Sequence, residues 1–202
     1  MDGGERKSGG SLQSMLRRAV TKRDPAELLW AAQLARDTLA ARFYLRHCTR
    51  VGAFTRLSGH PPLIHNQGTL IIGERVLLFS SLLPIELATL PGGTLTIGDR
   101  TSLNYGVSIA AHQSISIGRQ CRLGPYVSIQ DNDWHDVVDR SLRPPSRPVI
   151  IEDNVWLAAR AMVMPGVTVG HDSVVSAGAI VMSDIPPRSV AMGIPARVIR
   201  TF

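Results

Sequence analysis

Cysteine and aromatic residues are scarce in this 202-residue sequence. Its two cysteines, Cys48 and Cys121, lie far apart, so the sequence indicates no disulfide framework and favours reduced thiols in the cytoplasm. Aromatic residues make up only 5% of the chain, although 44% of its residues are hydrophobic. This balance suits a thin core filled by valine, isoleucine and leucine.

Long apolar runs are absent as well. No stretch approaches the ~20 apolar residues that a membrane-spanning helix needs, and the polar residues 1–14 lack the apolar core of a signal peptide. We therefore expect a cytoplasmic protein without a transmembrane segment. The net charge is +6, but no Lys/Arg run is interleaved with aromatic residues, which disfavours nucleic acid as a partner.

The sequence instead contains a six-residue repeat, in which an aliphatic residue recurs at every sixth position apart from a two-residue slip after Ile109 and a loop after Ile129. The repeat positions are Ile97, Leu103, Ile109, Ile117, Leu123, Ile129, Ile151, Leu157, Val163, Val169, Val175 and Val181. A fixed short period predicts a stacked solenoid rather than a globular core. Because a small residue often follows the aliphatic one, we expect a three-sided parallel β-helix with the aliphatic side chains inside.

The chain divides into four segments around this repeat. Residues 1–23 are small, polar and basic and predict a mobile tail. Residues 24–68 predict an N-terminal helix and an entry segment. Residues 69–185 form the β-helix, interrupted by a loop at about 130–148, and residues 186–202 form a C-terminal extension.

The predicted helix begins with a recognisable signal at Asp24. Asp24 can cap it, Pro25 suits its first position, and Glu27 can complete a capping box. Apolar residues at helical spacing predict an amphipathic helix to about His47. Its apolar stripe consists of Leu28, Ala32, Ala35, Leu39 and Phe43.

The interrupting loop opens with Asp131-Asn132-Asp133-Trp134-His135 and has no hydrophobic period. Protruding loops of this length often carry function. A histidine with an ordinary pKa of about 6.5 is largely neutral at physiological pH. His135 is therefore a candidate base.

Several motifs in the right order resemble the hexapeptide-repeat acyltransferases, in particular the maltose, galactoside and polysaccharide O-acetyltransferases. They are the Asp131–His135 segment, Pro148–Leu157, Met164–Gly170, Ser176–Gly178 and Gly193–Arg197. The resemblance extends from about Ile72 to Arg200. It implies a left-handed parallel β-helix, a homotrimer with active sites between subunits, and acetyl-CoA as the acyl donor.

The resemblance also implies roles on the acceptor side. His135 matches the general base that takes the proton from an attacking hydroxyl in a ternary complex. The sequence leaves Asp133 or a backbone carbonyl as the partner of its second ring nitrogen. Asn104 matches an asparagine that contacts the acceptor or the oxyanion, with a structural asparagine ladder as the alternative. The residues expected to bind the acceptor are Tyr105, His112, Asp131, Asp133 and Trp134.

On the donor side, the resemblance implies a groove for coenzyme A. The matching residues are Trp156, Ala159, Ala177, Gly178, Met182, Ser183, Arg197 and Arg200. Small residues let the pantetheine arm approach the backbone, and guanidinium groups suit phosphate oxygens. Met182-Ser183 departs from the Thr-Lys pair common in the family, and Arg160 and Arg188 are the candidate substitutes for the cationic contact of that lysine to the phosphates.

These features predict an acetyl-CoA-dependent O-acetyltransferase that acts on a hydroxyl of a sugar, polysaccharide or glycoside. One alternative is an N-acyltransferase acting on an amino sugar or another amine. Two others are a non-catalytic β-helix scaffold and a zinc protein like the γ-carbonic anhydrases. Zinc would need three converging histidines, whereas the residue five positions after His135 is Arg140. We therefore expect no metal.

Overall fold

The computed structural model describes residues 25–202. The predicted tail at residues 1–23 and the capping residue Asp24 lie outside the described residues. The chain forms two units, Met1–Asp37 and Thr38–Phe202, and helix α2 (Pro25–Tyr44) runs from the first into the second. Within residues 25–202, no helix combines the length and the apolar character needed to cross a membrane.

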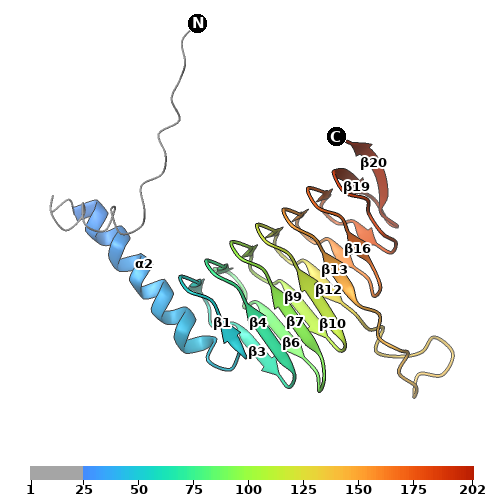
Figure 1. Ribbon diagram of the computed structural model, residues 1–202, viewed down its shortest axis with the longest axis horizontal. Helices are drawn as coiled ribbons and strands as arrows, with labels where there is room; N and C mark the ends of the chain where they lie inside the picture. The colour runs from blue at the N-terminus through green and yellow to red at the C-terminus, as the bar shows by residue number, and fades with distance from the viewer. Residues whose placement is uncertain (1–24) are drawn as a thin grey trace, which may run out of the picture. The chain divides into compact units, whose positions relative to one another are not determined.

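The second unit is a parallel β-helix of stacked coils, each of which contributes one strand to each of three sheets (Figure 1). Sheet A contains β1 (Arg50–Val51), β4 (Thr69–Ile72), β7 (Thr94–Ile97), β10 (Ser114–Ile117), β13 (Val149–Ile151) and β16 (Thr168–Val169). Sheet B contains β2 (Arg56–Gly59), β5 (Leu77–Ser80), β8 (Ser102–Leu103), β11 (Arg122–Leu123), β14 (Trp156–Leu157), β17 (Val174–Val175), β19 (Ser189–Met192) and β20 (Arg197–Thr201). Sheet C contains β3 (Leu63–Asn66), β6 (Glu86–Thr89), β9 (Ser108–Ala111), β12 (Ser128–Gln130), β15 (Met162–Val163) and β18 (Ile180–Val181).

The core of the β-helix consists of the repeat residues. On sheet A, Ile97 pairs in register with Ile117, Ile117 with Ile151, and Ile151 with Val169. Every repeat position predicted from the sequence is buried, with at most 2% of its surface exposed. Burying each such side chain stabilises the fold by about 1.5–3 kcal/mol. The predicted fold class is confirmed, including the terminal helix and the protruding loop.

The coils turn at three edges, which we call the A–B, B–C and C–A edges after the sheets that the chain leaves and enters. At the A–B edge, backbone is packed so closely that a Cβ on Gly98 would lie 2.5 Å from the carbonyl carbon of Gly118. Carboxylates also connect successive coils there, because Asp99 Oδ1 accepts a hydrogen bond from the Glu74 amide at 2.8 Å. Asp153 Oδ1 accepts one from the Arg119 amide at 2.7 Å.

The two ends of the β-helix differ from the sequence prediction. Helix α2 ends at Tyr44 rather than near His47. In its last turns the predicted stripe is wrong, because Leu39 and Phe43 are 66% and 60% exposed, whereas Ala41 is buried and belongs to the core. At the other end, β19 pairs in parallel with β17, so the stack continues past residue 185. The antiparallel strand β20 then pairs with β19 and ends it.

Candidate active site

The loop between β12 and β13 projects from the C–A edge and carries His135 (Figure 1). The Nδ1 atom of His135 lies 2.9 Å from the carbonyl oxygen of Arg140. Because a carbonyl oxygen only accepts hydrogen bonds, Nδ1 carries a proton, and in the neutral ring Nε2 therefore presents its lone pair. Of the two partners left open by the sequence, the structure therefore has the backbone carbonyl and not Asp133.

Asp131 anchors the base of this loop to the preceding coil. Its Oδ1 accepts a hydrogen bond from the amide of His112, and its Oδ2 accepts two more from Gln113 and Ser114, all at 2.7 Å. The residue has no exposed surface. The prediction that Asp131 binds an acceptor is therefore corrected, because its carboxylate is fully engaged by backbone amides within the chain.

Asn132 joins the two arms of the loop, and the sequence analysis did not single it out. Its Nδ2 donates to the carbonyl of Pro144 at 2.8 Å and to Ser146 Oγ at 3.0 Å. Its Oδ1 accepts a hydrogen bond from the amide of Trp134 at 2.7 Å. The available sequence signal was an asparagine two residues before that amide, a spacing typical of an Asx turn.

Three other predicted acceptor residues lie around His135. His112 and Trp134 form an edge-to-face pair, with ring centroids 4.3 Å apart. Burial lowers the pKa of His112, the nearby Asp131 carboxylate raises it, and Arg143 lowers it, with a net decrease that favours a neutral ring. Its Nε2 is buried and has no hydrogen-bond partner in the described structure. Asp133 forms an exposed ion pair with Arg147 at 3.1 Å.

A second group of predicted residues lies at the B–C edge. Asn104 and Tyr105 occupy one turn there, and Ala159, Ala177 and Gly178 occupy later turns of the same edge. The Gly178 amide donates to the carbonyl of Ala159 at 2.9 Å, which stacks two of these turns directly. A Cβ on Gly178 would meet no atom within 4 Å, so this edge is open.

Asn104 does not form an asparagine ladder. Its Oδ1 accepts a hydrogen bond from the adjacent Tyr105 amide at 3.1 Å. The equivalent position of the next coil is Gly124, whose amide donates to the carbonyl of Leu157. The structure therefore excludes the asparagine ladder, and the role of Asn104 toward the acceptor stays a prediction.

The remaining predicted donor residues lie on sheet B and at the C–A edge. Trp156 lies on the outer side of sheet B, where it lines a shallow depression of about 460 Å³ together with Arg122 and Arg188. Arg197 and Arg200 belong to β20 in the same sheet, and one Arg197 nitrogen donates to the Ala196 carbonyl at 2.9 Å. Met182 and Ser183 follow β18, so they lie at the C–A edge with His135.

Sheet C separates the two groups within one chain. A four-residue strand such as β9 spans about 13 Å at 3.3 Å per residue, with Asn104 before it and His112 after it. His135 follows the next strand of the same sheet. A single chain therefore does not bring His135 and Asn104 together.

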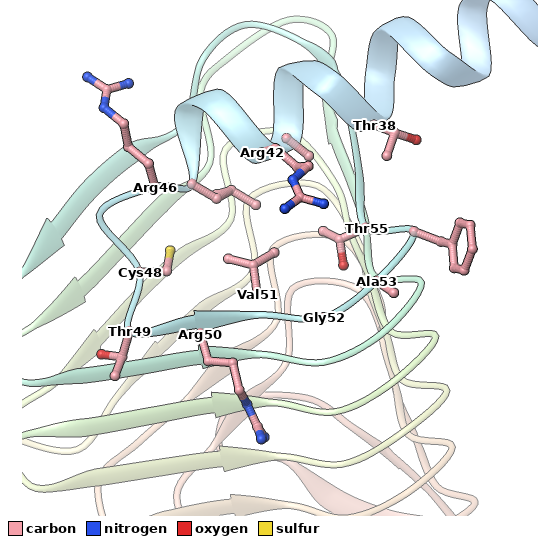
Figure 2. Close-up of a pocket in the computed structure, with 13 residues that line it drawn as sticks. Thr38, Arg42, Arg46, Cys48, Thr49, Arg50, Val51, Gly52, Ala53 and Thr55 are labelled. Atoms are coloured by element: carbon pink, nitrogen blue, oxygen red, sulfur yellow. The ribbon is translucent and has the colours of Figure 1, made fainter.

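A separate cavity of about 390 Å³ lies where the last turns of α2 meet the first coil. Figure 2 shows Arg42 directed from the helix into this space, with Cys48 and Thr55 on the facing coil. Burial raises the pKa of Cys48 to about 12, which keeps its thiol protonated. Among the described residues that line the cavity, none is a histidine or a carboxylate, so this cavity lacks a base.

Within residues 25–202, no three side chains of His, Cys, Asp or Glu converge on a point that could hold an ion. This arrangement gives the zinc alternative no support.

Comparisons with known proteins agree on one family. Residues 148–182 match the family described as "Bacterial transferase hexapeptide (six repeats)". A provisionally assigned lipopolysaccharide biosynthesis O-acetyl transferase of Escherichia coli K12, WbbJ, is 30% identical over 181 residues, which cover 84% of this chain and 87% of that protein. The galactoside O-acetyltransferase of the same organism is 36% identical over 111 residues, covering 54% and 55% of the two chains.

Two solved structures extend this likeness to the fold. A hexapeptide-repeat acetyltransferase of Vibrio cholerae, complexed with acetyl coenzyme A, has a TM-score of 0.59 and 25% identity, covering 84% of this chain and 85% of that one. A galactoside acetyltransferase in complex with coenzyme A has a TM-score of 0.53 and 26% identity, covering 83% and 82%.

Proposed function

The chain belongs to the hexapeptide-repeat acetyltransferases, and from this membership we propose that it acetylates a hydroxyl of a sugar, polysaccharide or glycoside, with His135 as the general base. It is an acetyltransferase whose acyl donor is acetyl-CoA. The observation that carries the catalytic part of the proposal is the contact between His135 Nδ1 and the Arg140 carbonyl. That contact leaves Nε2 free to accept a proton.

The proposed reaction is a direct attack without a covalent enzyme intermediate. Nε2 of His135 removes the proton of the acceptor hydroxyl while the hydroxyl oxygen attacks the thioester carbonyl. The C–S bond then breaks, and coenzyme A leaves as a thiol after taking up the proton from the imidazolium. Neither cysteine competes as a nucleophile, since burial raises the pKa of Cys121 to about 11 and that of Cys48 to about 12.

The separation of the two residue groups supports a homotrimer with active sites between subunits. A site that uses both His135 and Asn104 requires a C–A edge and a B–C edge to face each other. In a ring of three identical subunits, one edge of each subunit can face a different edge of its neighbour. Each such interface would complete one site, and three sites would form in all.

Mixed trimers test this arrangement. We expect His135→Ala and Asn104→Ala chains to be nearly inactive alone, but to regain activity when they are unfolded together and refolded. Random assembly pairs an intact His135 with an intact Asn104 at about one quarter of the interfaces, so about a quarter of wild-type activity should return. Mixtures no more active than the two parents would place each site within a single chain.

The donor residues fit an extended ligand along the B–C edge and sheet B. The small residues Ala159, Ala177 and Gly178 leave the turns open to a pantetheine arm. Trp156 offers an exposed ring beside them. Arg197 and Arg200 supply positive charge for the nucleotide phosphates, while Met182 and Ser183 would reach the donor from the C–A edge of the other subunit.

Replacing Arg197 by alanine should weaken acetyl-CoA binding about tenfold, because a hydrogen bond to a charged group is worth about 1.5 kcal/mol or more. Isothermal titration calorimetry measures the Kd directly. Arg42→Ala is the matched control, since Arg42 lines the cavity at the N-terminal end and should leave the Kd unchanged. Equal Kd values for the Arg197 variant and the wild type would remove Arg197 from the donor site.

An acceptor screen tests the function as a whole. Release of free coenzyme A from acetyl-CoA would be followed with a β-galactoside, maltose and glucosamine as probes. Ester formation on the neutral sugars supports O-acetylation, whereas amide formation on glucosamine alone would favour the N-acyltransferase alternative. Calorimetric titration with coenzyme A comes first, because absence of binding would contradict the donor assignment before any acceptor is tried.

A further inference from the structure

We propose that Asn132 is a positioning residue that holds the His135 imidazole in the tautomer needed for catalysis. This inference rests on the proposed role of His135 as the base. Asn132 does not reach the reacting atoms in this proposal. It acts through the two arms of the loop by three side-chain hydrogen bonds that we call the Asn132 bridge, of which two join the arms and one, to the Trp134 amide, lies within the outgoing arm.

The Asn132 bridge connects the outgoing arm of the loop to the returning arm. Asn132 and Trp134 belong to the outgoing arm, and Pro144 and Ser146 belong to the returning arm. Asn132 is 2% exposed, so these bonds are shielded from water. Shielded and fully paired polar networks impose one geometry on the groups they join.

The outer part of the loop has no comparable attachment to the β-helix. Val137 and Val138 are 89% and 93% exposed. The side-chain hydrogen bonds there are local, since Asp136 Oδ1 accepts from the amides of Val138 and Asp139, and Asp139 Oδ1 accepts from Ser141. One backbone bond, from the Asp136 amide to the Leu142 carbonyl at 3.0 Å, joins the two arms at the tip. The buried side-chain bonds between the arms lie at the base of the loop.

The spacing of the arms at the base acts on the His135 contact together with the backbone bond at the tip. His135 lies on the outgoing side of the exposed tip, and Arg140, whose carbonyl receives the Nδ1 hydrogen bond, lies beyond the tip. The ion pair between Arg147 and Asp133 also joins the arms, but both of its side chains are exposed, and exposed ion pairs contribute little. The Asn132 bridge is the buried side-chain connection between the arms.

The tautomer of His135 can be measured without turnover. In nitrogen-15 NMR of the full chain, the neutral His135 ring should be protonated at Nδ1 in the wild type. In Asn132→Ala we expect a mixture of the two tautomers, because the arms lose their buried side-chain connection and keep only backbone bonds and an exposed ion pair. Ser146→Ala removes one bond of the bridge and should give a smaller change in the same direction. Ser141→Ala, a control in the same loop that breaks only a tip hydrogen bond, should match the wild type.

Kinetics supply the second readout. Because a displacement of about 1 Å can cost about 100-fold in rate, we expect Asn132→Ala to lower kcat by about 10- to 100-fold. The Kd for acetyl-CoA should stay within about twofold, since most of the donor residues of the chain lie at the B–C edge or on sheet B, away from the loop. A variant that had only lost stability would lower the unfolding temperature without changing the His135 tautomer.

Two results would overturn the proposal. One is an unchanged Nδ1-protonated His135 in both Asn132→Ala and Ser146→Ala. The other is Asn132→Asp behaving like the wild type, because the aspartate can still accept from the Trp134 amide but cannot donate to Pro144. Failure of the proposed function itself is recognised separately, by normal turnover in His135→Ala. The tautomer measurement does not depend on that outcome.

Discussion

His135→Ala is expected to lower the rate of acetyl transfer by about 10²- to 10⁴-fold, the usual contribution of a general base. The variant keeps its acetyl-CoA binding, because the donor residues do not depend on this side chain. A sugar hydroxyl gives up its proton reluctantly at neutral pH, so removal of Nε2 leaves only orientation by binding. The measurement is kcat with an acceptor that supports turnover, alongside the Kd for acetyl-CoA.

His171→Ala is the matched control for this variant. His171 is an exposed histidine at the A–B edge that pairs with Asp172 at 2.9 Å, and its loss should change kcat by less than about twofold. If His135→Ala keeps more than about a tenth of wild-type activity while His171→Ala is normal, another group must remove the proton.

Asp131→Ala is expected to have the largest effect on stability. It leaves the amides of His112, Gln113 and Ser114 without their acceptor. A hydrogen bond to a charged group is worth about 1.5–3 kcal/mol, and an unpaired buried donor costs about as much. Allowing for water at the vacated position, we expect a loss of about 3 kcal/mol and a fall of about 10 °C in the unfolding temperature, measured by calorimetry or circular dichroism.

Asp133→Ala isolates the effect of burial, because Asp133 lies two residues further along the same loop. Its partner is the exposed Arg147, and an exposed ion pair contributes at most about 1 kcal/mol. The unfolding temperature should therefore change by no more than about 3 °C. Equal destabilisation by the two variants would show that the three amide bonds of Asp131 are not what stabilises the edge.

The sequence predicted the β-helix well because the six-residue repeat that specifies this fold is a local pattern. One aliphatic residue per six decides which side chains face inward, and the strands that follow are short and pair with their equivalents one coil later. The motifs around His135 and Gly178 fall at two different edges of the β-helix, the C–A and the B–C edge. Recognising that sheet C separates these edges required the order of the strands in the structure.

The contacts between coils could not be predicted from the sequence. Asp131 belongs to the same short motif as His135, so it resembled an acceptor-binding residue until its bonds to residues 17–19 positions earlier were known. The Arg140 carbonyl carries no side-chain signal that could mark it as the partner of His135. In helix α2, apolar residues occur on several sides, so the spacing of Leu39 and Phe43 did not reveal that Ala41 faces the core.

Four aspartates at the edges of the β-helix each bind the coil that precedes their own. Asp99, Asp131, Asp153 and Asp184 each accept backbone amides from the coil before their own. During synthesis from the N-terminus, some backbone amides of a finished coil therefore lack their hydrogen-bond acceptor until the next coil has left the ribosome. Folding on the ribosome would trail translation by about one coil of 18 residues, the distance from Ile151 to Val169. Because β20 pairs with β19 in the opposite direction, sheet B ends without a further parallel strand.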